Sequence, residues 1–266
     1  MLQRRIFFGI IMNKELNMPQ FLINSKDVEN GKVIISDKEN FTHIAKALRV
    51  KSGEKLLLID ENQIQYETIV NQVTNKEIFV TVEKSYKSKR KLNFKLYLAQ
   101  SPLRSDAQST VIEKATELGV EGVYPVYTDN CALSSSVIEK KIPKWQRIMQ
   151  EAFKQCERAY IPTCFELTDL ENIIEFNNNG FKIIAFCERC ANMSLHEYCE
   201  CNHIEENDKL IVIIGPEGGF SEREFELFRK NNIPMLTLGE LILKADTAVT
   251  VALGNIIYEF NNYRQN

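Results

Sequence analysis

Residues 210–228, LIVIIGPEGGFSEREFELF, decide the fold of this chain. The apolar run 210–214 predicts a buried strand, and GPEGG at 215–219 predicts a tight loop at its carboxyl end. Ser221 followed by Glu224 predicts a capping box, so a helix is expected to begin there. In open α/β sheets, ligands bind beyond the carboxyl ends of the strands, and glycines let them approach the backbone closely. We therefore expect a ligand site at this loop.

The loop at 215–219 fits neither the Walker A motif nor the Rossmann fingerprint, because the glycine spacing differs and no Lys-Ser/Thr pair follows. Glu217 lies within this loop and allows two interpretations. Its carboxylate could bind an amine or a hydroxyl of a ligand, or it could accept hydrogen bonds from nearby backbone amides as a turn residue.

A second loop of this kind follows closely. Residues 236–239, LTLG, end another predicted strand, and ELILKADTA continues to residue 248. Asp246 is placed to cap an apolar helix over 247–260. Capping and chemistry are equal alternatives for this carboxylate.

Strands and helices alternate from residue 92 onward. Strands are expected at 93–99, 120–127, 181–186, 210–214 and 233–238. One helix is expected at 106–118, with Gly119 placed to end it. Another should open at Pro143, because proline suits a first helical turn, and run to about Arg158. This alternation predicts an α/β domain with a largely parallel sheet.

Residues 19–83 instead predict a small barrel. Short strands are expected at 21–23, 33–35, 55–59, 66–73 and 78–82. One helix interrupts them, capped by Asp37, with an apolar face of Phe41, Ile44, Ala45 and Leu48. The segment 84–95 has six basic residues and no acid, so it is the expected domain boundary. It is either a solvated linker or a phosphate contact.

Composition sets the outer limits. Hydrophobic residues make up 44% of the 266 residues, charged residues 26%, and the net charge is -3, which excludes a disordered chain, a fibrous repeat and a globally basic coat protein. A local basic site remains compatible with this balance. No apolar run reaches the roughly 20 residues of a membrane span. Residues 1–17 show a weak signal-peptide pattern without a cleavage site, so we expect an added N-terminal extension before Met18.

The seven cysteines favour reduced thiols in a cytoplasmic protein. They also allow one alternative, a zinc site. Its candidate ligands are Cys187, Cys190, Cys199, Cys201, His196 and His203. The Cys199–Cys201 spacing is one residue too tight for a usual zinc knuckle, so we expect no metal.

Five motifs resemble one family. GPEGGFS at 215–221 and LGELILKADTAV at 238–249 resemble the knotted SPOUT methyltransferases, and among them the family of ribosomal RNA small subunit methyltransferase E. HIAKALR at 43–49, KATELGV at 114–120 and the E-A-x-x-Q-x-x-R pattern at 151–158 agree, in the correct order. The resemblance spans residues 18 to 260.

The resemblance implies a PUA-like RNA-binding β-barrel at 18–88 and a SPOUT α/β methyltransferase domain with a deep trefoil knot at 89–266. It implies a cytoplasmic homodimer that methylates N3 of a uridine in 16S ribosomal RNA of the small subunit, with S-adenosyl-L-methionine as cofactor. A noncatalytic RNA-binding member of the fold and a methyltransferase for another RNA position are the alternatives.

The resemblance also implies site residues. The implied reaction needs a general base, or a cation that stabilises the developing anion. The candidates are Asp246 or Glu217 as the base and Lys244, Arg104 or Arg158 as the stabilising cation. The expected cofactor-binding residues are Glu188, Gly215, Pro216, Glu217, Gly218, Gly219, Leu236, Leu238, Gly239, Ile242, Leu243, Thr247 and Ala248. The expected RNA-binding residues are His43, Lys46, Arg49, Lys89, Arg90, Lys91, Lys114 and Arg158. A basic helix with Lys141, Lys144, Arg147, Lys154 and Arg158 is a further RNA candidate.

The family usually has I-L-R-T-E-T-A where this chain has ILKADTA at 242–248. Lys244 keeps the charge of arginine but loses its planar fork. Ala245 lacks a hydroxyl, and Asp246 carries its carboxylate on a shorter stem.

Overall fold

The computed structural model describes residues 20–188 and 190–261, so the expected extension 1–17 lies outside the described residues. The chain divides into two compact units between Lys87 and Ser88. The sequence prediction places this boundary one residue later.

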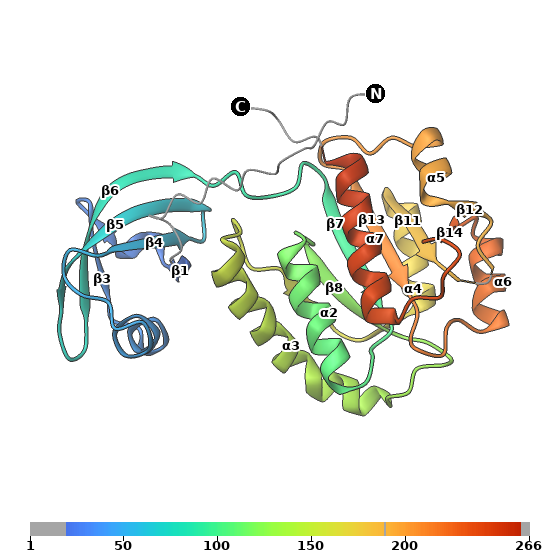
Figure 1. The fold of residues 1–266 in the computed structure, drawn as a ribbon, viewed down its shortest axis with the longest axis horizontal. Coiled ribbons are helices and arrows are strands. Elements are labelled where there is room, and N and C mark those ends of the chain that lie inside the picture. The colour runs from blue at the N-terminus through green and yellow to red at the C-terminus, as the bar shows by residue number, and fades with distance from the viewer. Residues whose placement is uncertain (1–19, 189, 262–266) are drawn as a thin grey trace, which may run out of the picture. The chain divides into compact units, whose positions relative to one another are not determined.

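The first unit is a six-stranded sheet with the order β1-β4-β5-β6-β3-β2. Only the β1–β4 pair is parallel. Its strands are β1 (Gln20–Ile23), β2 (Val28–Glu29), β3 (Lys32–Ile35), β4 (Lys55–Asp60), β5 (Ile64–Val73) and β6 (Ile78–Lys87). A 3-10 turn, η1 (Ser25–Asp27), joins β1 to β2. These strands are drawn in blue to cyan in Figure 1. Their buried side chains form one apolar cluster, which includes Phe21, Val33, Leu58 and Val80.

The expected helix of this unit is present but irregular. Asp37 caps α1 (Lys38–Phe41), because its Oδ1 accepts the Asn40 N–H at 2.8 Å. A π-helical turn, η2 (Thr42–Ala47), follows. Phe41 and Ile44 are buried as expected, whereas Leu48 lies after the turn and is exposed, which corrects the predicted apolar face.

The basic segment 84–95 is only partly a linker. Lys84 and Lys87 belong to β6, and the Lys84 ammonium lies 3.9 Å from the Glu67 carboxylate on β5. The connection therefore begins at Ser88, and five of the twelve residues of the expected boundary, 84–87 and Lys95, belong to strands.

The second unit is an eight-stranded sheet in which every pairing is parallel. The order is β10-β8-β7-β13-β11-β14-β12, and β9 also pairs with β8. The strands are β7 (Lys95–Gln100), β8 (Gly122–Tyr127), β9 (Thr163–Cys164), β10 (Thr168–Asp169), β11 (Phe181–Phe186), β12 (Met193–Ser194), β13 (Lys209–Ile214) and β14 (Met235–Thr237). The predicted α/β architecture is confirmed, and the trefoil knot stays a prediction.

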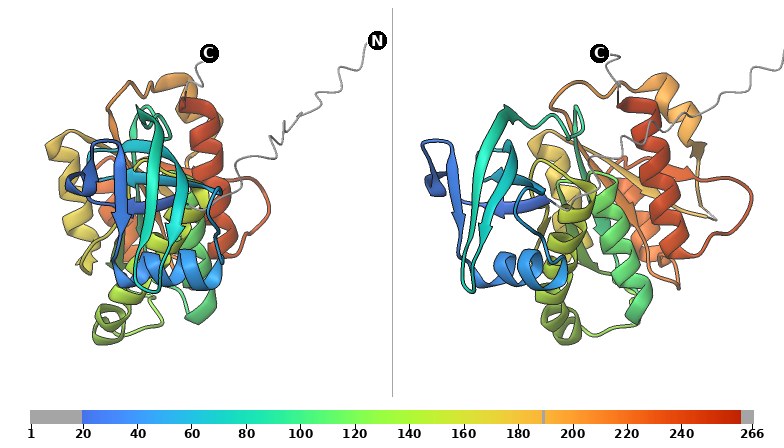
Figure 2. Two further views of the ribbon diagram at one scale, coloured as in Figure 1. Left: turned by 90° about the vertical axis from the view of Figure 1, so that its left-hand side faces the viewer. Right: turned by 60° about the vertical axis from the view of Figure 1, so that its left-hand side comes forward.

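Helices cover both faces of this sheet (Figures 1 and 2). One core lies under α2 (Ser105–Glu117), α3 (Ser135–Cys156), α5 (Leu195–Cys201) and α7 (Ala245–Phe260). The other lies under α4 (Leu170–Glu175), the 3-10 turn η3 (Phe176–Asn179) and α6 (Glu222–Lys230). Alternate residues of the central strands point into each core, so the interior residues 96–99, 183–186 and 210–214 of β7, β11 and β13 are continuously apolar.

Two helix starts differ from the sequence prediction. α3 begins at Ser135, so Pro143 lies inside the helix, because Ile138 and Ile142 extend its apolar face toward the N-terminus. α7 begins at Ala245 with Lys244 in the capping position. Asp246 is therefore in the first turn, where its Oδ1 accepts the Thr247 N–H at 2.9 Å.

Within residues 20–188 and 190–261, no group of three or more His, Cys, Asp or Glu side chains is arranged to hold a metal ion. The helices in the same part of the chain are all too short or too polar to cross a membrane.

Candidate functional site

A cavity of about 870 Å³ opens at the carboxyl ends of β11, β13 and β14. The register explains its position, because Ile214 at the end of β13 pairs with Gln100 of β7 and with Phe186 of β11. Most of the catalytic and cofactor-binding residues predicted from the sequence line this cavity. They are Glu188, Gly215, Pro216, Glu217, Gly218, Gly219, Leu238, Gly239, Ile242, Leu243, Lys244, Asp246 and Ala248. Both glycine-containing loops therefore meet at one cavity.

Three expected residues are not part of the cavity wall. Leu236 is fully buried in the core, and its carbonyl accepts the Cys187 N–H at 2.9 Å, so neither group faces a ligand. Thr247 is exposed on the outer side of α7. Arg104 is exposed and lies beside the cavity, joined to it through its backbone N–H.

Other lining residues were missed by the sequence analysis. They are Leu103, Ala107, Phe186, Cys187, Ile214, Phe220, Phe225 and Ala245. Thr237 and Leu241 also line the cavity, and both lie in the second loop that the sequence predicts as part of the cofactor site. Four of the missed residues, Leu103, Phe186, Cys187 and Ile214, are at or just beyond the carboxyl ends of β7, β11 and β13. The rule that ligands bind at these ends, applied to every strand rather than to two loops, would have found Leu103, Phe186 and Cys187.

The GPEGG loop is open toward the cavity but fixed at its edges. Gly219 has a φ of +67°, and a Cβ added there would meet no atom within 4 Å, so this backbone is accessible to a ligand. The Glu217 Oε1 accepts the Arg104 N–H at 3.1 Å, which ties the loop to the start of α2. Glu217 thus accepts a hydrogen bond from a backbone amide, but that amide belongs to a residue far away in sequence.

The loop after β8 holds the other side of the GPEGG loop. The Asn130 Nδ2 donates to the Gly218 carbonyl at 3.3 Å and to the Gly219 carbonyl at 3.1 Å. A Cβ at Gly218 would lie 3.1 Å from the Asn130 Cβ, so glycine allows this close approach. At the end of β7, the side-chain amide of the buried Gln100 donates to the Gly215 carbonyl at 3.2 Å.

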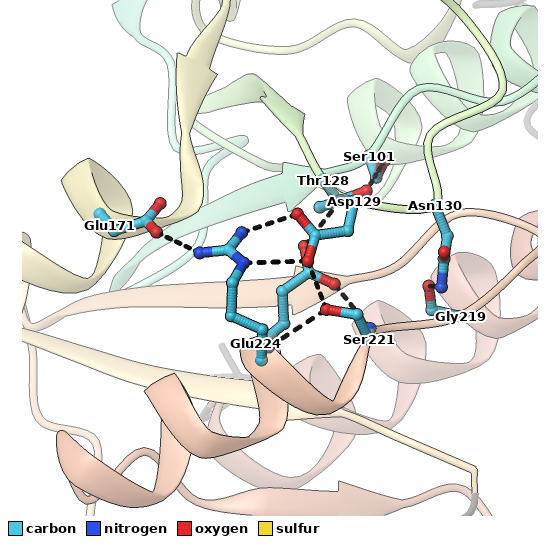
Figure 3. A network of polar contacts seen from close by, with 9 residues as sticks. Ser101, Thr128, Asp129, Asn130, Glu171, Gly219, Ser221 and Glu224 are labelled. Atoms are coloured by element: carbon cyan, nitrogen blue, oxygen red, sulfur yellow. Dashed lines mark hydrogen bonds and ion pairs between the residues drawn. The ribbon is translucent and has the colours of Figure 1, made fainter.

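A polar network behind this loop fixes the start of α6 (Figure 3). Ser221 and Glu224 form the predicted capping box, in which Ser221 Oγ accepts the Glu224 N–H and Glu224 Oε2 accepts the Ser221 N–H. The second Glu224 oxygen accepts the Asp129 N–H at 3.0 Å. Arg223 donates to both Asp129 oxygens, at 2.8 and 2.9 Å, and to Glu171 at 2.7 Å.

This network predicts an acid-sensitive component of stability. The hydrogen bonds from Arg223 and Ser221 lower the pKa of Asp129 from 3.8 to about 2. Because the folded-state pKa is depressed, the stabilisation is fully present above pH 3.8 and is lost as the pH falls through about 2. Urea unfolding at a series of acidic pH values should show this loss. The Asp129→Asn variant should show a shallower decline in the same window, and an identical decline would contradict the assignment.

The second loop leads into α7. Thr237 Oγ1 accepts the Gly239 N–H at 3.1 Å and donates to the Gly239 carbonyl at 2.9 Å, which closes a tight turn after β14. Lys244 and Asp246 follow, and both line the cavity. One short segment therefore brings an ammonium and a half-buried carboxylate to the same wall.

The expected RNA-binding cations are in different environments. In the first unit, Lys46 and Arg49 are exposed, whereas His43 packs edge-on against the Phe21 ring at 5.4 Å. In the second unit, Lys89 and Lys91 are exposed. Arg90 forms an ion pair with Glu157, and Lys114 contacts Glu113 at 2.8 Å and Glu117 at 2.9 Å. These carboxylates raise the pKa of Lys114.

Arg158 is placed inside the protein and not on an RNA-binding surface. It is 5% exposed and donates to the Thr116 carbonyl at 2.8 Å and the Gly119 carbonyl at 3.4 Å. These carbonyls end α2, so the guanidinium acts as a buried cap for that helix. This corrects both expected roles of Arg158, as an RNA contact and as a stabiliser of the reacting anion.

We expect Arg158→Met to destabilise the protein by about 2–3 kcal/mol, since it removes charge-assisted hydrogen bonds from buried carbonyls. Urea unfolding checks this. The exposed Lys91→Met change serves as a control, with an expected effect within about 0.5 kcal/mol. A fall in RNA affinity at unchanged stability would return Arg158 to the RNA-binding set.

Comparison with known proteins decides the family. A model described as an RNA methyltransferase domain matches residues 90–257, more than half of the chain. The chain belongs to this family. A second model, described as an RNA methyltransferase PUA domain, matches residues 35–83 of the first unit. The predicted pair of domain types is therefore confirmed.

Individual relatives agree over nearly the whole chain. The ribosomal RNA small subunit methyltransferase E of Mesomycoplasma hyopneumoniae is 29% identical over 242 residues, which covers 90% of this chain and 99% of the relative. The protein of that name from Bacillus subtilis is 22% identical, and the match covers 89% of this chain and 94% of the relative. A crystal structure of the Neisseria gonorrhoeae enzyme of that name, bound to S-adenosyl methionine, superposes with a TM-score of 0.77. It is 20% identical, and the superposition covers 92% of this chain and 99% of that chain. The last comparison shows that the fold is shared.

Proposed function

We propose that this RNA methyltransferase transfers a methyl group from S-adenosylmethionine to N3 of a uridine in 16S ribosomal RNA of the small subunit. The observation that supports this most directly is the joining of both motif loops at one cavity in a chain of the RNA methyltransferase family. The names of the Mesomycoplasma hyopneumoniae and Bacillus subtilis relatives support the ribosomal target.

The cavity fits the cofactor. Its volume of about 870 Å³ lies in the range of small-molecule sites, and Leu238, Ile242 and Leu243 give an apolar wall for an adenine ring. A Cβ added at Gly219 or Gly239 would meet no atom within 4 Å, so a ligand can approach the backbone closely at both positions. Glu188 adds a carboxylate at the rim. Bound S-adenosylmethionine supplies an electrophilic methyl group, so the protein must position it and prepare the nucleophile.

Uridine N3 carries a proton and is a poor nucleophile until that proton leaves. In the proposed mechanism Asp246 accepts this proton, and Lys244 stabilises the negative charge that develops on the neighbouring carbonyls. Asp246 is preferred to Glu217 because it is half-buried and only two residues from a cation on the same wall. Glu217 is exposed and is engaged in holding Arg104.

A pair of Glu217 variants separates the two carboxylates. Glu217→Gln keeps an oxygen that accepts the Arg104 N–H, so we expect methyl transfer within about twofold of the unchanged enzyme. Glu217→Ala loses this bond and loosens the loop, which should weaken cofactor binding about tenfold, equivalent to about 1.4 kcal/mol. Calorimetry and steady-state kinetics check both. A hundredfold loss of kcat in the glutamine variant would instead identify Glu217 as the base.

The proposed reaction is tested with labelled S-adenosylmethionine and small ribosomal subunits that lack the modification, with naked 16S ribosomal RNA in parallel. Digestion to nucleosides should yield labelled 3-methyluridine. A different methylated nucleoside would overturn the target atom. If the protein binds S-adenosylmethionine but forms no methylated product, a different RNA is the substrate. If it neither binds the cofactor nor forms a product, the protein is a noncatalytic RNA-binding member of the fold.

We also propose that the enzyme acts in the cytoplasm as a homodimer. Leu241, Ile242 and Tyr258 are 81%, 66% and 80% exposed in this chain, and all three belong to the last loop and α7. Large apolar side chains exposed to this extent are a feature of interfaces between protein chains. Sedimentation analysis of the unchanged protein and of Tyr258→Glu should show a dimer and a weakened dimer, and a monomer in both would contradict this proposal.

A further inference from the structure

Eight of the eighteen Lys and Arg residues in the described part of the second unit contact a carboxylate, backbone carbonyls or an aromatic ring. Arg90, Lys114, Lys154, Lys182, Arg223 and Arg229 form ion pairs with carboxylates. Arg158 is buried against backbone carbonyls, and Lys209 lies over the Phe181 ring at 4.6 Å. These cations have roles within the fold, so their number does not predict an RNA surface.

The outward face of α3 is different. Lys140, Lys144 and Arg147 are exposed, and their spacing of four and three residues places them on one stripe of the helix. In the described part of the chain, no carboxylate lies within ion-pair distance of any of the three. Ile138, Trp145 and Met149 on the opposite side are buried in the core, so the orientation of the stripe is fixed.

A stripe of three like charges lowers the stability of α3. Like charges four residues apart repel each other and destabilise a helix by a few tenths of a kcal/mol per pair. The next residue of the stripe, Glu151, offers no relief, because its carboxylate is 3.1 Å from the Lys154 ammonium. An anionic ligand would neutralise these charges.

The position of α3 connects this stripe to the cavity. Asn130, whose amide holds the Gly218 and Gly219 carbonyls, lies five residues before the first residue of α3. From Asn130 to Lys140 the chain spans at most about 25 Å, given about 3.4 Å per extended residue and 1.5 Å per helical residue. The N-terminal end of α3 lies at the side of the unit where the loop from β8 arrives (Figure 1).

We propose that Lys140, Lys144 and Arg147 bind the phosphates of the RNA strand next to the nucleotide that enters the cavity. RNA is the polyanion that this surface fits, and its identity as the ligand rests on the proposed function. Phosphate contacts position a nucleic acid without reading its sequence, so this stripe sets the register of the RNA and leaves base recognition to the cavity.

The test is the salt dependence of RNA binding. The triple variant Lys140→Gln, Lys144→Gln, Arg147→Gln is compared with the unchanged protein on a 16S ribosomal RNA transcript, between about 50 and 200 mM salt. Loss of three phosphate contacts should reduce the slope of log K against log salt by about 2 for single-stranded RNA and by nearly 3 for a duplex. Cofactor affinity should stay unchanged, which shows that the cavity is intact.

A matched control removes three charges elsewhere. The control is the triple variant Lys182→Gln, Lys209→Gln, Arg229→Gln, which lowers the net charge by the same three units as the α3 triple. Its three cations instead contact Asp208, the Phe181 ring and Glu222. It should leave the slope unchanged. An equal fall of the slope in both triples, or no fall in the α3 triple, overturns the inference. If the unchanged protein methylates no ribosomal RNA but the two triples differ, the proposed function fails and the α3 surface stands.

Discussion

Replacing Asp246 with asparagine is expected to lower kcat for methyl transfer by about 100- to 10,000-fold, the usual contribution of a general base. Asparagine keeps the size of the side chain and an oxygen that can accept the Thr247 N–H at 2.9 Å, so the first turn of α7 should persist. The affinity for S-adenosylmethionine should change little, because the cavity wall keeps its shape. The measurements are single-turnover transfer to small subunits and calorimetric titration of the cofactor.

The Asp246→Glu variant is the matched control for this prediction. Glutamate restores the carboxylate, and the related family usually has glutamate at the corresponding position. We expect this variant to recover most of the activity lost in Asp246→Asn. Unchanged turnover in the asparagine variant would remove Asp246 from the mechanism, and loss in both variants would show that the position, and not its charge, is essential.

The elements that could be predicted from sequence depend on neighbours in the chain. The capping box of Ser221 and Glu224 uses residues three apart, and the apolar runs of β11 and β13 are continuous because both faces of a parallel sheet are buried. The loop that follows β13 was identified for the same reason, since strand, glycines and helix start are contiguous. Both loops of the cavity were therefore found without any knowledge of the fold.

The parts that could not be predicted depend on partners far away in sequence. Arg158 resembles a surface cation in its motif, but the carbonyl of Thr116, 42 residues earlier, accepts its hydrogen bond. Arg90 is 67 residues from Glu157, the carboxylate that neutralises it. Helix starts were also misplaced, because Ile138 and Ile142 belong to the apolar face only once the core has formed. Charge in a motif thus indicates a functional site only after its partners are known.

Glu224→Ala is expected to lower the free energy of unfolding by about 3–5 kcal/mol. Glu224 is fully buried, and its two oxygens accept the N–H groups of Asp129 and Ser221 at 3.0 and 2.7 Å. Alanine leaves both amides without these acceptors and creates a cavity behind the GPEGG loop. The two segments that hold this loop would then separate, so cofactor affinity of the folded protein should fall as well.

Glu222→Ala provides a control on the same turn of α6. Glu222 is exposed and pairs with Arg229 at 2.8 Å, and an ion pair at the surface contributes at most about 1 kcal/mol. Urea unfolding and cofactor titration of both variants compare a buried carboxylate with a solvated one in the same helix. Equal unfolding midpoints would show that Glu224 adds nothing beyond a surface charge. The expected large difference would show that the cofactor loop is positioned by a buried carboxylate behind it, which contacts neither substrate nor cofactor.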